Sequence, residues 1–312
     1  MTELLLDSLE VKGYRCFEHL TIEKLGRVNL IVGKNNVGKT ALLEALWIYL
    51  NQGSHHKVSD ILNSRDEDKQ LESIARQNIP INWFEVLLTR ANGRKKIIEI
   101  RGNDNVLTLS KSDSSPFSIN NPLKNRVLSS FIETKGLDYS EIIELWDKIE
   151  LTTREDDVTE SMKFILPNLL RVRVRNVQNN ERIPFAQVDN VEIPLPLKSL
   201  GEGLNRLFGI SLALVNCNNG ILLIDEIESG LHYSVLPDVW KLIFKTAKDL
   251  NVQVFATTHS KDCIEAFTQA AVDDEESEGM LVRLERQGEK IVAKPIAEER
   301  LALAISHDVE VR

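Results

Sequence analysis

Eight residues near the N-terminus have the types and spacing that can bind a chain of phosphates. They fit the pattern GxxxxGK(S/T) without a mismatch, between an apolar run and a segment with helical spacing. The glycines let successive backbone N–H groups surround phosphate oxygens, and the helix start adds partial positive charge. The lysine can reach the β- and γ-phosphates of a nucleotide, and the threonine hydroxyl can bind Mg²⁺. These residues are Gly33, Lys34, Asn35, Asn36, Val37, Gly38, Lys39 and Thr40.

Two carboxylates, Asp225 and Glu226, directly follow the apolar run 221–224. A buried strand presents side chains at its carboxyl end, which is where α/β folds place ligands. Asp225 is expected to bind Mg²⁺, directly or through water, and Glu226 to polarise the attacking water. A strand that simply ends in solvated acids is the plainer alternative, and the phosphate loop favours the catalytic interpretation.

Two further segments have chemistry of the same kind but weaker patterns. His259 follows another apolar run, where a neutral imidazole can hydrogen-bond the γ-phosphate and respond to its loss; a purely structural histidine is the alternative. Ser199, Gly201 and Glu202 precede a helix, and a serine with glycines at a helix start can bind an anion. Serine and glycine are also ordinary helix caps, so this second pattern alone is not specific.

The elements expected to position these residues alternate between strands and helices in the last half of the chain. Strands are expected at 171–177, 221–224 and 252–257, helices at 203–215, 233–250 and 261–271, and then a hairpin at 280–294 and a short helix. Earlier, strands are expected at 4–12, 20–23, 27–32, 83–89, 96–101 and 106–110, a helix from residue 39, a linker at 111–121 and helices over 122–166. This order predicts an α/β fold with a mixed or parallel sheet covered by helices and an antiparallel N-terminal portion. Residues 111–170 are expected to form a mainly helical insertion between 1–110 and 171–312.

Composition excludes several classes of protein. The 312 residues are 42% hydrophobic and 27% charged, which is typical of a globular chain, and no apolar stretch is long enough to span a membrane. No signal peptide is visible, and three separated cysteines indicate free thiols in a reducing cytoplasm. The net charge of −9 disfavours tight, unaided binding to nucleic acid. The alternating Arg171, Arg173 and Arg175 predict either a phosphate-contacting stripe or, more simply, a solvated sheet face.

In their order and spacing, these motifs resemble the ABC-type ATPase heads of the SMC, RecF and OLD-nuclease group. Asp225-Glu226 resembles the acidic pair of that group, and residues 228–232 resemble the D-loop of its OLD-like branch. Ser199-Leu200-Gly201-Glu202 stands where the family signature lies, but has leucine between the serine and the glycine. Arg15 resembles an arginine that approaches the phosphates in such heads. The glutamine of the family's Q-loop is left open among Gln77, Gln178 and Gln187.

The resemblance implies an ABC-type head that binds ATP and Mg²⁺ and sandwiches ATP between two copies of the chain. Ser199, Gly201 and Glu202 of one copy would then face the γ-phosphate held by the other. The expected function is a nucleotide-dependent dimerising switch in DNA repair or anti-phage defence. We expect it to act through a protein effector, such as a Toprim-like nuclease or a toxin, with any contact to nucleic acid indirect.

Two alternatives differ in class. A nucleotide-binding subunit of a membrane transporter would also hydrolyse ATP, but the altered signature and the OLD-like segments disfavour it. A nuclease of the OLD type would need a metal-binding Toprim domain after the head, and only about fifty residues follow His259. Nuclease activity of this chain itself is therefore not expected.

Overall fold

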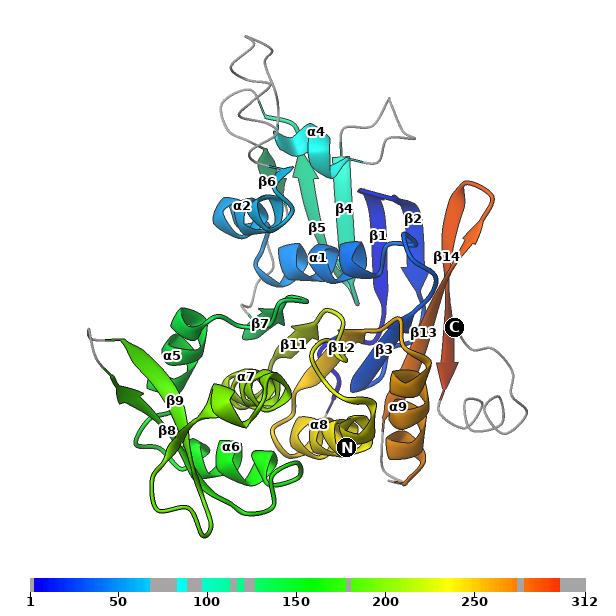
Figure 1. The fold of residues 1–312 in the computed structure, drawn as a ribbon. Coiled ribbons are helices and arrows are strands. Elements are labelled where there is room, and N and C mark those ends of the chain that lie inside the picture. Colours follow the sequence, from blue (N-terminus) through cyan, green and yellow to red (C-terminus); the bar gives the residue numbers. More distant parts are fainter. Residues whose placement is uncertain are drawn as a thin grey trace.

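The computed structural model describes residues 3–67, 83–88, 97–112, 117–120, 127–177, 181–273 and 278–297. Its centre is a six-stranded sheet in the order β14-β13-β3-β12-β11-β7 (Figure 1). All neighbouring strands in it are parallel except β14, which forms a hairpin with β13. The strands are β3 (Val28–Val32), β7 (Ser129–Ile132), β11 (Ile221–Ile224), β12 (Gln253–Thr257), β13 (Gly279–Gln287) and β14 (Lys290–Ala297).

Helices cover one face of this sheet, and their apolar side chains form one of two core clusters. They are α5 (Tyr139–Asp147), α6 (Arg154–Met162), α7 (Glu202–Asn216), α8 (Leu236–Asp249) and α9 (Lys261–Asp273). A single 3-10 turn, η3 (Tyr233–Val235), precedes α8, so the helix expected from residue 233 becomes regular three residues later. Pro237 lies in the first turn of α8. Backbone N–H groups in a first turn have no acceptor within the helix, so proline, which lacks an N–H, loses no hydrogen bond there.

The other face of the sheet packs against α1 and a second, antiparallel sheet, which lie above it in Figure 1. This five-stranded sheet has the order β2-β1-β4-β5-β6. Its elements and neighbours are β1 (Leu9–Tyr14), β2 (Phe17–Ile22), β4 (Ile97–Gly102), β5 (Asn105–Ser110), β6 (Ser118–Asn120), α1 (Lys39–Leu50), α2 (His55–Ser64) and α4 (Trp83–Leu87). The fold is therefore the expected mixed α/β head with an antiparallel N-terminal portion.

Strict alternation along the central strands explains why two separate cores exist. Leu222 and Ile224 of β11 belong to the cluster under α7 and α8, whereas Leu223 between them belongs to the cluster under α1. Successive side chains of a strand point to opposite faces, so a strand covered on both faces is apolar throughout. The strands of the central sheet that are covered on both faces therefore appear in the sequence as unbroken apolar runs.

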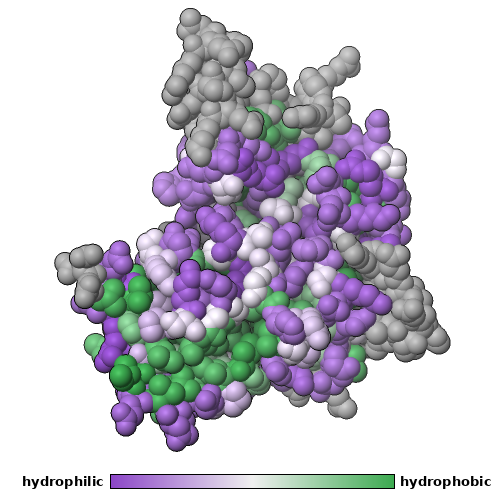
Figure 2. Space-filling model, viewed as in Figure 1, coloured by the Kyte–Doolittle hydropathy of each residue, from purple (hydrophilic) through white to green (hydrophobic). Residues whose placement is uncertain are grey.

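A small three-stranded sheet, in the order β10-β9-β8, precedes the helix α7. It consists of β8 (Leu169–Asn176), β9 (Arg182–Val188) and β10 (Leu195–Pro196), followed by the 3-10 turn η2 (Leu197–Leu200). Arg171, Arg173 and Arg175 lie with Phe185 along a hollow of about 630 Å³, and Arg173 also pairs with Glu155 of α6. Figure 2 shows that apolar side chains gather over the helices and small sheet in its lower left, while the upper part is mainly hydrophilic.

Three expectations about secondary structure are wrong. Residues 83–87 form the helix α4 and not a strand, and residues 129–132, expected to be helical, form the edge strand β7 of the central sheet. Within the expected linker, residues 118–120 form β6. The expected C-terminal helix lies outside the described residues. The division of the chain into a head and an inserted segment is not tested by these observations and stays a prediction.

Candidate active site

The phosphate loop connects the buried strand β3 to the helix α1 and has three residues with positive φ. These are Gly33 (144°), Asn36 (61°) and Gly38 (97°). A Cβ atom at Gly38 would lie 2.5 Å from Cys16 Sγ and 2.8 Å from the Phe17 ring, so only glycine fits here. Lys34, Asn35 and Asn36 are exposed, while Val37 anchors the loop in the core. The sequence thus forms an open, backbone-lined turn at the start of a helix, which is suited to bind an anion.

Lys39 is buried at the first position of α1, and its ammonium group folds back over the loop. Its Nζ donates to the carbonyl oxygens of Gly33 at 2.9 Å and Lys34 at 3.3 Å. These bonds hold the positive charge beside the turn formed by residues 33–38. Phosphate oxygens can take the place of carbonyl acceptors, so the lysine is in position to bind them.

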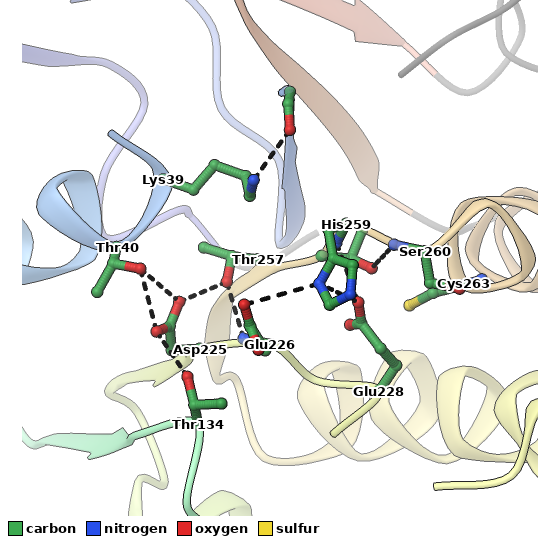
Figure 3. A network of polar contacts seen from close by, with 12 residues as sticks. Lys39, Thr40, Thr134, Asp225, Glu226, Glu228, Thr257, His259, Ser260 and Cys263 are labelled. Atoms are coloured by element: carbon green, nitrogen blue, oxygen red, sulfur yellow. Dashed lines mark hydrogen bonds and ion pairs between the residues drawn. The ribbon is translucent and has the colours of Figure 1, made fainter. Parts of the chain in front are cut away.

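Asp225, at the carboxyl end of β11, receives three hydroxyl groups from three different segments (Figure 3). Thr40 Oγ1 lies 3.1 Å from both carboxylate oxygens, Thr257 Oγ1 donates at 2.6 Å, and Thr134 Oγ1 donates at 3.0 Å. The carboxylate is 6% exposed and is therefore held in one orientation. This arrangement joins the phosphate loop to the ends of β11, β12 and β7.

Glu226 is the next residue, and its backbone has the unusual φ of 45° for a residue with a side chain. Its N–H donates to Thr257 Oγ1 at 2.8 Å, which helps to hold this conformation. Its side chain is 38% exposed, in contrast to the buried Asp225, so water can reach the carboxylate. The two neighbouring acids thus have different surroundings: one is enclosed by hydroxyl groups and the other is open.

His259 lies at the end of β12, between two carboxylates. Its Nδ1 is 3.2 Å from Glu228 Oε1 and 3.6 Å from Glu226 Oε1, and its backbone N–H also donates to Glu228 at 3.0 Å (Figure 3). Glu228 is largely buried and fixes both the backbone and the ring of the histidine. Glu228, three positions after Asp225, therefore holds the ring beside the edge of the sheet formed by Lys39, Thr40, Asp225 and Glu226, which is called the catalytic edge for its proposed role.

The residues present fit a hard divalent cation bound together with a nucleotide. Thr40 and Asp225 supply a hydroxyl and a carboxylate, and Mg²⁺ commonly takes only one or two protein ligands beside phosphates and water. Within the described ranges, no group of three His, Cys, Asp or Glu side chains forms a metal site without such help. The donor set is thus more typical of a metal that arrives with phosphates than of a permanent structural ion.

The signature segment, residues 199–202, is open to solvent. Ser199, Gly201 and Glu202 are all exposed, and Glu202 forms an ion pair with Lys198 at 3.2 Å. Gly201 caps α7 with a φ of 117°. The structure brings Lys39, Thr40, Asp225, Glu226 and His259 to one edge of the sheet (Figure 3), while Ser199, Gly201 and Glu202 are exposed to solvent.

Arg15 follows β1 and is engaged by acidic side chains. Its guanidinium forms a paired contact with Glu67 at 2.9 and 3.0 Å, and its Nε lies 2.8 Å from Glu44. Glu44 is deeply buried, and this burial raises its pKa although Arg15 and Arg65 act in the opposite direction. Whether Arg15 also acts on phosphates stays a prediction.

Sequence reasoning missed several residues of this edge. Thr134 follows β7 and contacts Asp225, but no motif marks it and its segment was expected to be helical. Thr257 ends an apolar run and could have been found by the rule that led to Asp225. Among the Q-loop candidates, Gln187 lies in the small sheet, where its amide donates to Val191 O at 2.6 Å; Gln77 and Gln178 lie outside the described residues.

Comparisons with known proteins agree with this geometry. The model of the AAA ATPase domain family matches residues 5–120 and 109–264, which is most of the chain. An "ATP/GTP phosphatase" of Helicobacter pylori is 25% identical, and the match covers 85% of this chain and 88% of that protein. A "DNA replication and repair protein RecF" of Listeria monocytogenes is 31% identical over 35% of this chain and 32% of its own length.

Solved structures show the same fold at low sequence identity. An SMC head bound to the C-winged helix domain of ScpA superposes with a TM-score of 0.63, covers 96% of this chain and 99% of its own, and is 12% identical. The SMC head domain from Thermotoga maritima gives 0.54, with 93% and 98% covered and 14% identity. No helix in the described part of the chain is long and apolar enough to cross a bilayer. The chain belongs to the AAA ATPase domain family and is an ATPase with an SMC- and RecF-like head.

Proposed function

We propose that two copies of this chain bind Mg-ATP between them and separate after hydrolysis, as a switch in a DNA-related process. The observation that carries the proposal is the contact of Thr40 with Asp225 at 3.1 Å, at an edge that also holds Lys39 and Glu226 (Figure 3). In this proposal Lys39 binds the β- and γ-phosphates, and Thr40 and Asp225 hold Mg²⁺. The metal would neutralise charge that develops on the phosphates during hydrolysis.

The side chain of Glu226 is the proposed general base. It is open to water, whereas Asp225 already accepts three hydroxyl hydrogen bonds and is nearly buried. A base must lie within hydrogen-bond reach of the water that it activates, and a half-exposed carboxylate beside the phosphate loop satisfies this condition. His259, held by Glu228, is placed to contact the γ-phosphate or the same water.

The proposed partner across the nucleotide is a second copy. Ser199, Gly201 and Glu202 are exposed, and the ion pair of Glu202 is with Lys198 of the same segment. Joining two copies would place these groups against the γ-phosphate, and loss of that phosphate would remove a bridging ligand. The dimer is therefore expected to form with ATP and to open after hydrolysis.

We infer that the output passes through another protein. The SMC head of similar fold is bound to a winged-helix domain, and the RecF relative is named for DNA replication and repair. The apolar surface over α6, α8 and the small sheet is a candidate contact area for such a protein. DNA repair or anti-phage defence remains the proposed setting, with any nuclease or toxin activity supplied by the partner.

The test is the Glu226→Gln variant, which keeps the shape of the side chain and removes the base. We expect it to bind Mg-ATP but to hydrolyse it at least about 100-fold more slowly. Light scattering should then show a dimer with ATP and a monomer without it, while the wild-type protein returns to monomer as ATP is consumed. A Glu226→Gln protein that stays monomeric when saturated with ATP contradicts the sandwich.

A further inference from the structure

A buried arginine on the signature helix contacts the backbone of the catalytic edge. Arg206 is one turn after Glu202 on α7 and is 8% exposed. Its Nη1 donates to the carbonyl oxygens of Glu133 at 2.8 Å and Thr134 at 3.2 Å. Its Nη2 donates to those of Asp225 at 3.1 Å and Glu226 at 3.3 Å. One guanidinium group therefore binds four carbonyl groups.

These four carbonyl groups belong to the ends of two neighbouring parallel strands. Residues 133–134 follow β7, residues 225–226 follow β11, and Asp225 N–H donates to Ile132 O at 2.8 Å between them. A guanidinium group is planar and presents its donors in a fixed fork, so each terminal nitrogen can serve one strand end. The side chain thus fixes both ends relative to each other and to α7.

A second buried arginine, Arg27, has partners of a different kind. Arg27, 7% exposed, is bonded to the side chains of Glu278 and Asn251 before β3, at the opposite end of the strand from the phosphate loop. The four hydrogen bonds of Arg206 all go to backbone oxygen atoms, although Asp225, Glu226 and Glu228 lie near enough to act on it electrostatically. Burial lowers the pKa of Arg206, and these three carboxylates oppose that effect. The guanidinium charge thus lies near the catalytic carboxylates, while its hydrogen bonds go to backbone carbonyl groups.

The carbonyl group of Glu226 is the important contact, because this residue has a φ of 45°. Such a conformation is unfavourable for a residue with a side chain, and it persists when surrounding bonds hold it. Thr257 holds the N–H of Glu226 and Arg206 holds its carbonyl oxygen. Together they determine the direction in which the carboxylate leaves the backbone.

The start of α7 also touches the turn after Glu228. A Cβ atom at Gly203 would lie 3.2 Å from the carbonyl oxygen of Gly230, so the first turn of the helix lies against residues 230–231. Movement of the signature segment would therefore displace this turn and also Arg206, which lies one helical turn later. Leu207 and Phe208, next to Arg206 on α7, are fully buried in the core.

We propose that Arg206 is a positioning residue that sets the orientation of Glu226 and links it to the signature end of α7. Engagement of Ser199 and Gly201 by a second copy would act through the first turns of α7 on the backbone that carries the base. The catalytic carboxylate would then be correctly placed only in the assembled dimer. This inference rests on the proposed function, because it takes Glu226 as the base and the signature as the contact between copies.

The test compares Arg206→Ala and Arg206→Lys with the buried-arginine control Arg27→Ala. We expect kcat of both Arg206 variants to fall on the order of 100-fold, since a displacement of about 1 Å at a catalytic group has an effect of this size. The Kd for Mg-ATP should stay within about threefold of wild type, because Lys39 and Thr40 keep their contacts. Lysine should not substitute, since a single ammonium group cannot serve both strand ends.

Chemical rescue separates positioning from general damage. Guanidinium ion, at concentrations that do not unfold the protein, should restore part of kcat to Arg206→Ala, and methylammonium should not. Arg27→Ala should keep its kcat and show no rescue. If Arg206→Ala is poorly folded, Arg206→Lys, checked by circular dichroism and ATP binding, provides the kcat comparison.

Two results would overturn the inference and can be told apart from failure of the proposed function. Folded Arg206 variants that keep wild-type kcat, or that lose kcat only together with ATP binding, show that Arg206 has no positioning role. A Glu226→Gln protein that hydrolyses ATP like wild type removes the proposed base, whatever Arg206 does. The inference holds when Glu226→Gln is slow, Arg206→Ala is slow and rescued by guanidinium, and Arg27→Ala is unaffected.

Discussion

The catalytic edge and the signature segment differ in how complete they are within one chain. At the edge, Asp225 already binds the hydroxyl groups of Thr40, Thr134 and Thr257, and Lys39 is held over its loop. In the signature segment, Ser199 and Gly201 are exposed, and Glu202 forms a surface ion pair with Lys198. The side chains of the first region are thus held in place within one chain, whereas those of the second face solvent.

The difference between the two regions should separate the affinity for ATP from the rate of its hydrolysis. Groups fixed before binding lose little freedom when the nucleotide arrives, so a single chain can bind ATP well. Hydrolysis, in our proposal, also needs the exposed segment of a second copy. Binding should therefore depend on the edge alone, and turnover on both regions.

The largest effect is expected from Lys39→Ala, which removes the positive charge of the catalytic edge. Nucleotide binding, measured by calorimetry, should weaken on the order of 100- to 1000-fold, because a buried charge that meets phosphates contributes several kcal/mol. Lys245→Ala on α8 is the control, since Lys245 is exposed and lies outside the phosphate loop. Equal ATP affinity in the Lys39→Ala and wild-type proteins would show that the loop is not the phosphate site.

The second prediction concerns the signature. Ser199→Asp places a negative charge on an exposed position and should lower kcat on the order of 100-fold while ATP affinity changes little. A mixture of Ser199→Asp and Lys39→Ala should recover part of the lost activity, because one composite site in a mixed dimer contains neither substitution. Mixtures that are no more active than the separate variants would count against sharing of the site between copies.

The third prediction concerns the histidine at the edge. Glu228→Gln keeps a hydrogen-bond acceptor for the N–H of His259 but removes the charge beside its ring. We expect single-turnover hydrolysis to slow on the order of tenfold, as is common when the partner of a functional histidine is changed. The exposed Glu265→Gln on α9 serves as the control. If Glu228→Gln matches that control, the orientation of His259 by Glu228 does not matter for hydrolysis.

The sequence was most informative where function depends on neighbouring residues. The phosphate loop and Asp225-Glu226 are local patterns, and each follows an unbroken apolar run that becomes a strand buried on both faces. Thr134 reaches Asp225 only because β7 pairs with β11, which lies about ninety residues later, and no local pattern encodes that pairing. Arg206 was likewise invisible, because its partners are backbone carbonyl groups that leave no trace in residue types.

The wrong element assignments have similar physical causes. The segment Trp83–Leu87 is a short apolar run, and periodicity over five residues cannot distinguish a buried strand from a helical turn. Ser129–Ile132 contains two serines and has few residues to show a pattern, so the helical spacing that follows it dominated the prediction. In both cases tertiary packing decided the structure, and the sequence around each element carried too little periodic signal.

The smallest effect is expected for substitution of Arg15, which will show how far the catalytic edge extends along the chain. The side chains of Cys16 and Phe17 lie against Gly38, so Arg15 is near the phosphate loop although Glu44 and Glu67 hold its guanidinium group. Arg15→Ala should raise KM for ATP about fivefold, which corresponds to about 1 kcal/mol. Glu67→Gln should leave KM unchanged or lower it, because Arg15 would lose one competing anion.

The control for Arg15 is Arg65→Ala at the end of α2. Arg65 also pairs with the buried Glu44, so both substitutions leave this carboxylate with one cation fewer. Only Arg15, however, is next to the residues that pack on the phosphate loop. A rise in KM confined to Arg15→Ala would extend the catalytic edge to the turn between β1 and β2. An equal rise in both variants would trace the effect to the unpaired charge of Glu44, and the phosphate-contacting role predicted for Arg15 would be wrong.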